Sequence, residues 1–191
     1  MDKSLQIAYL HFILLLLMQF LSAGEKWTYS AELMESDKIN NLDVQRLNKN
    51  VRFVKEDKIL LTDNAVRYVK DDIIHLNGNT MMINKMDTLT CDSMVYWSKS
   101  DSIYAIGNIR YVHGPDQGIL GDEMEVQYAD SLVEMIRVFK NAFAYNDLNV
   151  RINKDGPYLY FRDEMTSMEM LAYFQGEYIS KFELINMATT S

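Results

Sequence analysis

The 191-residue chain has few of the residues that cross-link or interrupt a protein. Its single cysteine, Cys91, excludes a framework of disulfides within the chain. Two prolines and eight glycines are too few for a Pro/Gly-rich linker, so one domain is the expectation at this length. Basic residues are also outnumbered by acidic ones, 19 to 27, and no basic face is visible. A nucleic-acid partner is therefore not expected, although a local patch can still bind an anionic ligand.

Catalytic and metal-binding motifs are missing as well. The sequence contains no G-x-S-x-G, P-loop or G-x-G-x-x-G. After residue 24 the only histidines are His75 and His113, and without a cysteine cluster or H-E-x-x-H they make a poor metal site. We expect both to be solvated surface side chains. Cys91 has no base indicated nearby and is interpreted as a small corner residue. We therefore expect no enzyme activity, no cofactor and no metal, and a surface-carbohydrate enzyme is only the third hypothesis.

One long apolar run occurs, between Ile7 and Leu21, and it ends in Ser22-Ala23-Gly24. A short apolar core followed by small residues is typical of a secretory signal, so residues 1–24 are interpreted as a signal peptide cleaved after Gly24. The alternative is a retained anchor, but the run is shorter than the roughly 20 residues that a membrane span prefers. The mature domain, residues 25–191, is then expected to fold outside the cytoplasm.

The stretch from Thr62 to Val112 contains an internal repeat. Five pairs of like residues lie 29 positions apart: Asp63 and Asp92, Asp72 and Asp101, Ile74 and Ile103, Gly78 and Gly107, Asn79 and Asn108. The register continues to Asp122 and to Lys140-Asn141, with an insertion near Tyr128–Glu134, and a weaker echo opens at Arg162-Asp163-Glu164-Met165. A fixed period of this size predicts stacked units of ~30 residues.

Within the units, apolar residues alternate with polar ones. Met124, Val126 and Tyr128, for example, alternate with glutamate and glutamine. This period of two predicts half-buried strands separated by polar turns such as Lys99-Ser100-Asp101. Two strands per unit predict an all-β, elongated two-sheet structure. The stretch from Glu164 to Phe174 also has helical spacing, but the repeat favours a strand there.

The ends of the stack and its corners have separate roles. Trp27–Leu33 and the segment from Tyr178 to Leu184 are expected at opposite ends, where uncovered edges favour pairing with another chain. The recurring polar corner residues are interpreted as structural, with asparagines in left-handed conformations or in a ladder and aspartates bonded to backbone amides. These residues are Asn50, Asn79, Asn108, Asn141, Asp63, Asp92, Asp122 and Asp163.

The motifs A-E-L (Ala31–Leu33), N-V-R-F (Asn50–Phe53), D-x-A/M-x-x-Y and G-N-T/I resemble the OstA (organic solvent tolerance) family. That family comprises LptA, the periplasmic part of LptC and the N-terminal domain of LptD. The resemblance extends from Trp27 to about Thr190. It implies a V-shaped β-jelly-roll in the periplasm that shields the lipid A acyl chains of lipopolysaccharide and passes them toward the outer membrane. It also implies partners, namely lipopolysaccharide and other such jelly-rolls, or itself, joined by edge-strand pairing. The acidic charge and the 33-residue unit depart from the family pattern, and no barrel follows.

The apolar faces carry the functional prediction. The hypothesis is an open groove that binds lipid, since acyl burial contributes about 0.8 kcal/mol per methylene. The alternative is a non-catalytic structural or adhesion module with a sealed core, which acts through edge-strand contacts with proteins. The residues expected to line the groove are Leu47, Val51, Phe53, Ile74, Leu76, Met82, Ile103, Ile109, Tyr111, Met124, Val126, Ile136, Val138 and Ala142.

Overall fold

The computed structural model describes residues 26–151, 156–176, 178–186 and 189–190. The described chain is all-β, as predicted, and contains no helix in those ranges. The expected signal peptide lies outside the described residues. The strands are β1 (Thr28–Ser30), β2 (Leu33–Ile39), β3 (Leu42–Lys55), β4 (Lys58–Tyr68), β5 (Ile73–Asn84), β6 (Asp87–Trp97), β7 (Ser102–His113), β8 (Gln117–Ala129), β9 (Leu132–Arg151), β10 (Tyr158–Gln175), β11 (Tyr178–Ile185) and β12 (Thr189–Thr190).

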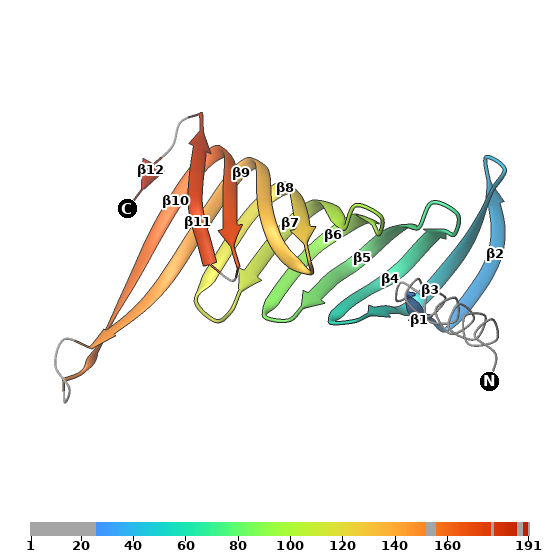
Figure 1. Cartoon of the computed structure of the whole chain (residues 1–191), viewed down its shortest axis with the longest axis horizontal. Helices are drawn as coiled ribbons and strands as arrows, with labels where there is room; N and C mark the ends of the chain where they lie inside the picture. Colours follow the sequence, from blue (N-terminus) through green and yellow to red (C-terminus); the bar gives the residue numbers. More distant parts are fainter. Residues whose placement is uncertain (1–25, 152–155, 177, 187–188, 191) are drawn as a thin grey trace, which may run out of the picture.

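All the strands belong to one antiparallel sheet, in which sequence neighbours pair from β3 to β11. At one end, β1 and β2 pair with different halves of β3. At the other end, β11 and β12 pair with β10. Figure 1 shows the resulting elongated stack, with β1 and β2 far from β11 and β12. The prediction that these segments form the two ends is confirmed.

Each long strand bends sharply near its middle. The ladder shifts register between Asn77 and Thr80 on β5, and equivalent shifts occur along the sheet from β3 to β10. At the bends Asn50, Asn79, Asn108 and Asn141 have φ of 51°, 44°, 47° and 53°. Asparagine tolerates this left-handed conformation better than most side chains, because its short amide bonds locally. The predicted left-handed corners are confirmed.

The bends fold the single sheet back on itself, so its two halves face each other. Side chains from opposite halves meet inside: Tyr128 Oη lies 3.8 Å from Met82 Sδ, and the rings of Trp27 and Tyr96 are 5.3 Å apart. The sequence predicted two sheets, whereas the structure joins both layers in one sheet. The reason is that each predicted pair of short strands is one long bent strand, which runs through both layers.

The turns between strands lie along two edges, which alternate along the chain (Figure 1). We call the turns at 56–57, 85–86 and 114–116 the first rim. The turns at 69–72, 98–101 and 130–131, together with Gly176, form the second rim. The two rims lie away from the corners, at the free edges of the folded sheet.

The C-terminal part of the repeat departs from its sequence pattern. The stretch 164–174 lies within strand β10, so the strand assignment was right. The echo at Arg162–Met165 does not mark a corner, because β10 bends between Ser167 and Glu169. Ser167 Oγ bonds the carbonyl of the residue two positions ahead, as Thr62 does at its own corner. The expected insertion near Tyr128 coincides with a register shift between Gln127 and Tyr128 in the β8–β9 hairpin.

Candidate functional site

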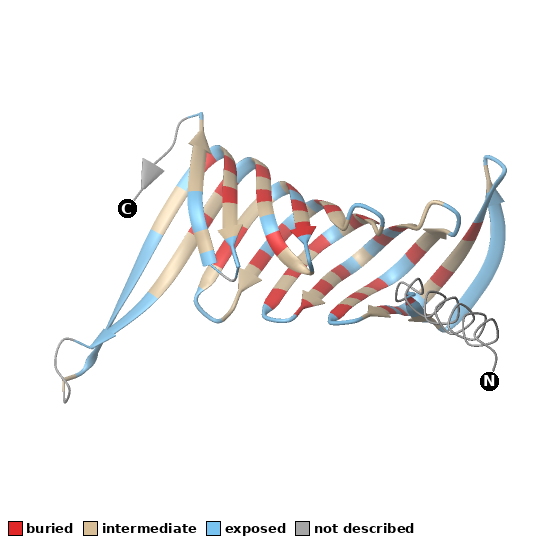
Figure 2. Cartoon of the chain, in the orientation of Figure 1, coloured by how far each residue is buried: buried red, intermediate tan, exposed pale blue. Residues whose placement is uncertain are grey.

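The predicted groove residues lie together on the inner face of the folded sheet. All fourteen are buried, with 2% exposure or less, and they belong to one continuous hydrophobic cluster. Figure 2 shows buried positions alternating with intermediate or exposed ones along most of the long strands. Period-two alternation therefore assigned the inner face correctly, because successive side chains leave opposite faces of a strand. That these side chains bind a lipid remains a prediction.

The inner face changes character toward the first rim. On the strands from β4 to β9, the inward-facing position nearest this rim is polar. These polar residues are paired across neighbouring strands, so they form a continuous row across the sheet. We call it the polar row, and it consists of Lys58, Asn84, Asp87, His113, Gln117 and Asn146. Lys58, Asn84 and Asp87 are buried, with 5%, 1% and 8% exposure. The interior is thus apolar near the corners and polar at the rim.

The two rims are held together by side chains from distant parts of the sequence. At the N-terminal end, Trp27 Nε1 donates a hydrogen bond of 2.8 Å to Ser98 Oγ. Further along, Asn84 Nδ2 donates to the carbonyl of Ser131 at 3.0 Å. Near the C-terminal end, the Phe174 ring packs edge-on against Tyr111, with ring centroids 6.3 Å apart. We call this line of contacts the seam.

An ion pair between a buried lysine and a half-buried aspartate occupies the middle of the seam. The Lys58 ammonium contacts both carboxylate oxygens of Asp101 and lies 4.3 Å from the centroid of the Tyr128 ring. Tyr96 Oη donates a hydrogen bond of 2.6 Å to the same carboxylate. Burial lowers the pKa of Lys58, and Asp101 partly offsets this effect. The pair therefore joins the two rims, but removing the Lys58 ammonium from water costs desolvation energy. Loss of Asp101 would leave that charge without compensation.

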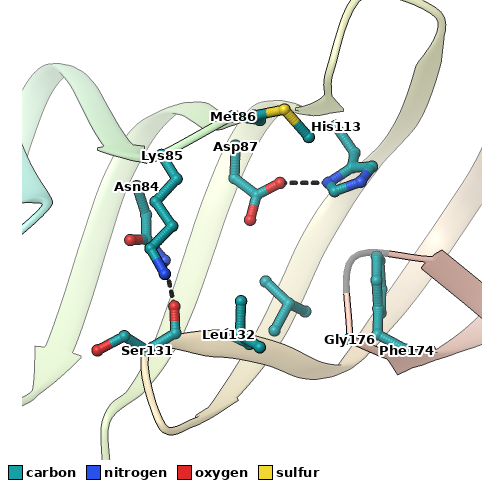
Figure 3. A pocket seen from close by; sticks show the side chains of 10 residues that line it. Asn84, Lys85, Met86, Asp87, His113, Ser131, Leu132, Phe174 and Gly176 are labelled. Atoms are coloured by element: carbon teal, nitrogen blue, oxygen red, sulfur yellow. Dashed lines mark hydrogen bonds and ion pairs between the residues drawn. The ribbon is translucent and has the colours of Figure 1, made fainter.

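Behind the seam the interior is filled by its own side chains. Figure 3 shows the space between the rims beside Asp87, His113 and Phe174, where a partly open cavity measures about 20 Å³. A cavity needs about 10–15 Å³ to hold one water molecule, so this one is close to that minimum. This cavity has no room for an acyl chain.

Predictions for the two histidines had different outcomes. His75 is exposed on the outer face and its ring contacts that of Tyr68 at a tilted angle, with centroids 5.2 Å apart. His113 was expected in solvent, but its side chain is only 14% exposed and its Nδ1 lies 2.6 Å from Asp87 Oδ1. It is largely covered because it continues the inner face, and Phe174 from the opposite rim packs against it.

Cys91 is a buried corner residue, as predicted. Burial is the largest cause that raises its thiol pKa to about 12, and the neighbouring Asp92 carboxylate adds to it. The thiolate population at neutral pH is therefore very small, which makes the side chain a poor nucleophile.

The corner aspartates bond differently from the prediction. Asp63, Asp92 and Asp122 were expected to accept hydrogen bonds from backbone amides. Instead they accept from the side-chain amides of the corner asparagines on the next strand, at distances of 2.7–3.1 Å. The fourth aspartate, Asp163, lies outside a corner and is exposed. Three of the four corner asparagines therefore form Asn–Asp pairs, because the bend places each of them beside the aspartate of the preceding strand. The fourth, Asn50, donates to Glu32 Oε1 at 2.5 Å.

Sequence reasoning missed the polar row, although the repeat contained its signal. Three of its members, Asn84, His113 and Asn146, follow one another after 29 and 33 residues, which are also the intervals from Asn79 to Asn108 and from Asn108 to Asn141. The sequence interpretation followed the apolar positions and gave these residues no shared role. Recurrence at one repeat position would have placed them in a single line across the sheet.

No protein-family model matches this chain, and no curated protein is significantly similar to it. Within the described ranges, no group of three or more His, Cys, Asp or Glu residues is arranged to hold a metal ion. The same ranges contain no helix with the length and apolarity that crossing a bilayer requires.

Proposed function

We propose that this chain is an exported, non-catalytic lipid carrier of the OstA type, which shields lipid A acyl chains of lipopolysaccharide in the periplasm. One observation carries the proposal: the inner face is amphipathic along the sheet, with apolar rows behind a polar row. An amphipathic ligand has the same division, and its acyl chains would lie against the apolar rows with the head group at the rim. A pump elsewhere would drive transport.

Loading requires the seam to open. The rims are joined by a small set of polar contacts and ring packings rather than by backbone pairing, as at Asn84 and Ser131. Each methylene that leaves water contributes about 0.8 kcal/mol, so several acyl chains could offset the loss of these contacts. The core also contains Met82, Met94, Met124 and Met170. Methionine side chains repack readily around different shapes.

The finer form of the fold is part of the proposal. Corner asparagines recur after 29, 29 and 33 residues, and each marks a bend in a long strand. These bends support a V-shaped β-jelly-roll built from ~30-residue units. The sheet edges at β1 and β2 and at β11 support end-to-end pairing with another jelly-roll of this kind, or with a second copy.

A sealed structural or adhesion module is the second candidate. The small cavity and the nearly complete burial of the inner face favour it, because a filled core needs no ligand. Its activity would lie in edge-strand contacts with other proteins, through the same ends of the sheet.

Photo-crosslinking in cells separates the two candidates. A benzophenone residue replaces Leu76, Ile109 or Val126 on the inner face, and outward His75, Arg110 or Glu125 provides the matched control. Lipopolysaccharide adducts at the inner positions alone are expected. Adducts at neither set, with normal export of the variants, would favour the sealed module.

Closing the seam tests the same proposal from the other direction. Cysteines replace Asn84 and Ser131 in a Cys91→Ser background, and a short bismaleimide joins them across the rims. The joined protein is expected to lose the crosslinks at Ile109, whereas the unjoined cysteine pair keeps them. Undiminished adducts in the joined protein would contradict entry through the seam.

A further inference from the structure

A surface hollow lies at the C-terminal end of the polar row, outside the seam. It measures about 330 Å³, and its lining consists of Met86, His113, Gly114, Pro115, Asp116, Gln117, Asn146, Asp147, Leu148 and Tyr178. It shares Met86 and His113 with the small cavity of Figure 3, so the two spaces adjoin along the first rim. A space of this size accommodates one or two sugar rings rather than a macromolecule.

An unpaired acceptor lines this hollow. The side-chain oxygen Oε1 of Gln117 is inaccessible to solvent, and the described residues provide no hydrogen-bond donor for it. A buried polar atom without a partner costs about 1–3 kcal/mol. If the amide turned toward the hollow, a ligand hydroxyl could donate to Oε1 and would remove that cost. Asn146 lies directly across the ladder from Gln117 and adds a further amide to the same wall.

The charge of the lining selects against anions. Among the described residues, neither lysine nor arginine lines the hollow, whereas Asp116 and Asp147 do. Arg162 donates to both carboxylate oxygens of Asp147, at 2.6 and 2.8 Å, so its charge is already compensated. This hydrogen bonding is the largest cause that lowers the pKa of Asp147 to about 2. Among the described lining residues, a phosphate would therefore meet two carboxylates, and His113 already places its Nδ1 2.6 Å from the Asp87 carboxylate. Hydroxyls would find acceptors there.

An apolar strip begins at the edge of the same hollow. Leu148 pairs with Phe161 and Val150 with Leu159 on the projecting part of the β9–β10 hairpin. By strand alternation they continue the inner face beyond Ala144, which is buried. Their exposed fractions are 40%, 51%, 43% and 37%, so the core's apolar face runs out into solvent here. Figure 2 shows this hairpin extending away from the buried body of the sheet.

We propose that the hollow binds an uncharged, hydroxyl-rich sugar and that an acyl chain of the same lipid lies on the strip from Leu148 to Phe161. The inference rests on the proposed function for the acyl chain and deepens it by naming the head-group chemistry. Contact is made through sugar hydroxyls rather than through a phosphate. Leu148 lines the hollow and begins the strip, so it marks the junction between head group and chain.

The test uses acyl-free probes, so that sugar recognition is measured apart from lipid carriage. The mature chain, labelled with nitrogen-15, is titrated with N-acetylglucosamine and, in parallel, with N-acetylglucosamine 1-phosphate. The neutral sugar is expected to shift the amide signals of Gln117 and Asn146. The phosphate is expected to bind about tenfold more weakly, because it adds charge beside Asp116.

Matched variants locate the site. Gln117→Ala and Asn146→Ala are each expected to weaken sugar binding about tenfold, since each removes hydrogen bonds to the ligand. Asn149→Ala changes an exposed amide on the opposite face of the same strand and is expected to leave affinity unchanged. The spectrum of each variant without ligand reports whether it is folded.

Three results would overturn the inference. They are the absence of shifts at Gln117 and Asn146 with the neutral sugar, tighter binding of the phosphate, and equal losses in the Asn146 and Asn149 variants. Failure of lipid carriage is distinguishable, because it would be seen as missing inner-face crosslinks while the sugar titration still succeeds. If the sugar binds but those crosslinks are missing, the sugar site in the hollow is supported and the acyl chain on the strip is not.

Discussion

Trp27 and Ser98 are 71 residues apart in sequence, yet the indole Nε1 donates a 2.8 Å hydrogen bond to the serine Oγ. The bond joins the first rim to the second at the N-terminal end of the seam. The Trp27 ring also packs edge-on against Phe53 and Tyr96, with centroids 6.3 and 5.3 Å away. Trp27 therefore closes one end of the interior by both packing and hydrogen bonding.

Replacing this tryptophan tests how much the closed end contributes to stability. Trp27→Ala is expected to lower the free energy of unfolding by about 3–5 kcal/mol, because it removes a large buried ring. Ser98→Ala removes only the hydrogen bond and is expected to cost about 1 kcal/mol. Urea unfolding measures both. The control, Met86→Ala on the exposed first rim, should stay within about 0.5 kcal/mol of the parent. Equal stability of the Trp27 and Met86 variants would exclude a stabilising role for the closed end.

The buried pair in the seam predicts unequal effects for its two partners. Asp101→Asn leaves the Lys58 ammonium without its counter-charge and is expected to cost about 3–5 kcal/mol. Lys58→Met in the same chain is expected to recover most of that loss, because it removes the buried charge. Chemical unfolding of the two single variants and the double variant measures the coupling. Additive losses would indicate that the ammonium and the carboxylate do not depend on each other.

The lowered pKa of Lys58 also predicts a pH dependence. The unfolded chain titrates near 10.5, whereas burial places the folded pKa below that value. Between the two pKa values the unfolded state binds more protons at this lysine, so its contribution to stability rises as pH increases through this window. Burial raises the pKa of Tyr96, Tyr111 and Tyr128, which lowers stability over the same alkaline range. The Lys58 contribution is therefore the difference between the parent and Lys58→Met in unfolding measured at successive alkaline pH values. An identical profile in the two proteins would contradict this assignment.

The glycine corners predict a contrast between two positions. At Gly107, φ is 78° and a Cβ would lie 2.3 Å from Asp92 Oδ2. At Gly114, φ is 60° and a Cβ would meet no atom within 4 Å. Gly114→Ala should therefore cost only about 1 kcal/mol of backbone strain, and Gly107→Ala clearly more. Adding Asp92→Ala to Gly107→Ala should recover part of the difference. Thermal unfolding compares the three proteins, and equal costs at the two glycines would show that the corner has room for a methyl group.

The raised pKa of Cys91 predicts a protected thiol. At pH 8 the native protein should react with iodoacetamide far more slowly than the urea-unfolded chain, whose cysteine titrates near 9.0. An added cysteine at exposed Ser100 provides the reference rate in the folded state. Mass spectrometry of the alkylated peptides separates the two sites. Similar native rates at positions 91 and 100 would mean that the corner opens readily.

Much of the local structure could be read from residue order. Alternation of apolar and polar side chains predicted the strands and the inner face, because side chains of a strand leave it on opposite sides. Asn79 and Asn108, each after a glycine and 29 residues apart, predicted left-handed corners, and both have positive φ. Such features depend on a few neighbouring residues, so local sequence determines them.

Residues near the C-terminal end were harder to place. The echo at Arg162–Met165 resembled a corner, but the bend lies at Ser167, whose hydroxyl bonds the carbonyls of Glu169 and Ile185. The residues at Arg162–Met165 match the corner motif in type, but the pairing of β10 with β9 places the bend after Ser167. His113 was misplaced for a related reason, since the ring of Phe174 that covers it comes from the opposite rim.

By itself, the sequence determined the strands, their corners and which side chains face inward, because each depends on the local period of the chain. Only the tertiary structure decided that both layers form one folded sheet and that the rims meet. Contacts such as Lys58 with Asp101 and Trp27 with Ser98 join residues 43 and 71 positions apart. Pairing at such separations is set by how the whole sheet folds over, and no period in the sequence encodes it.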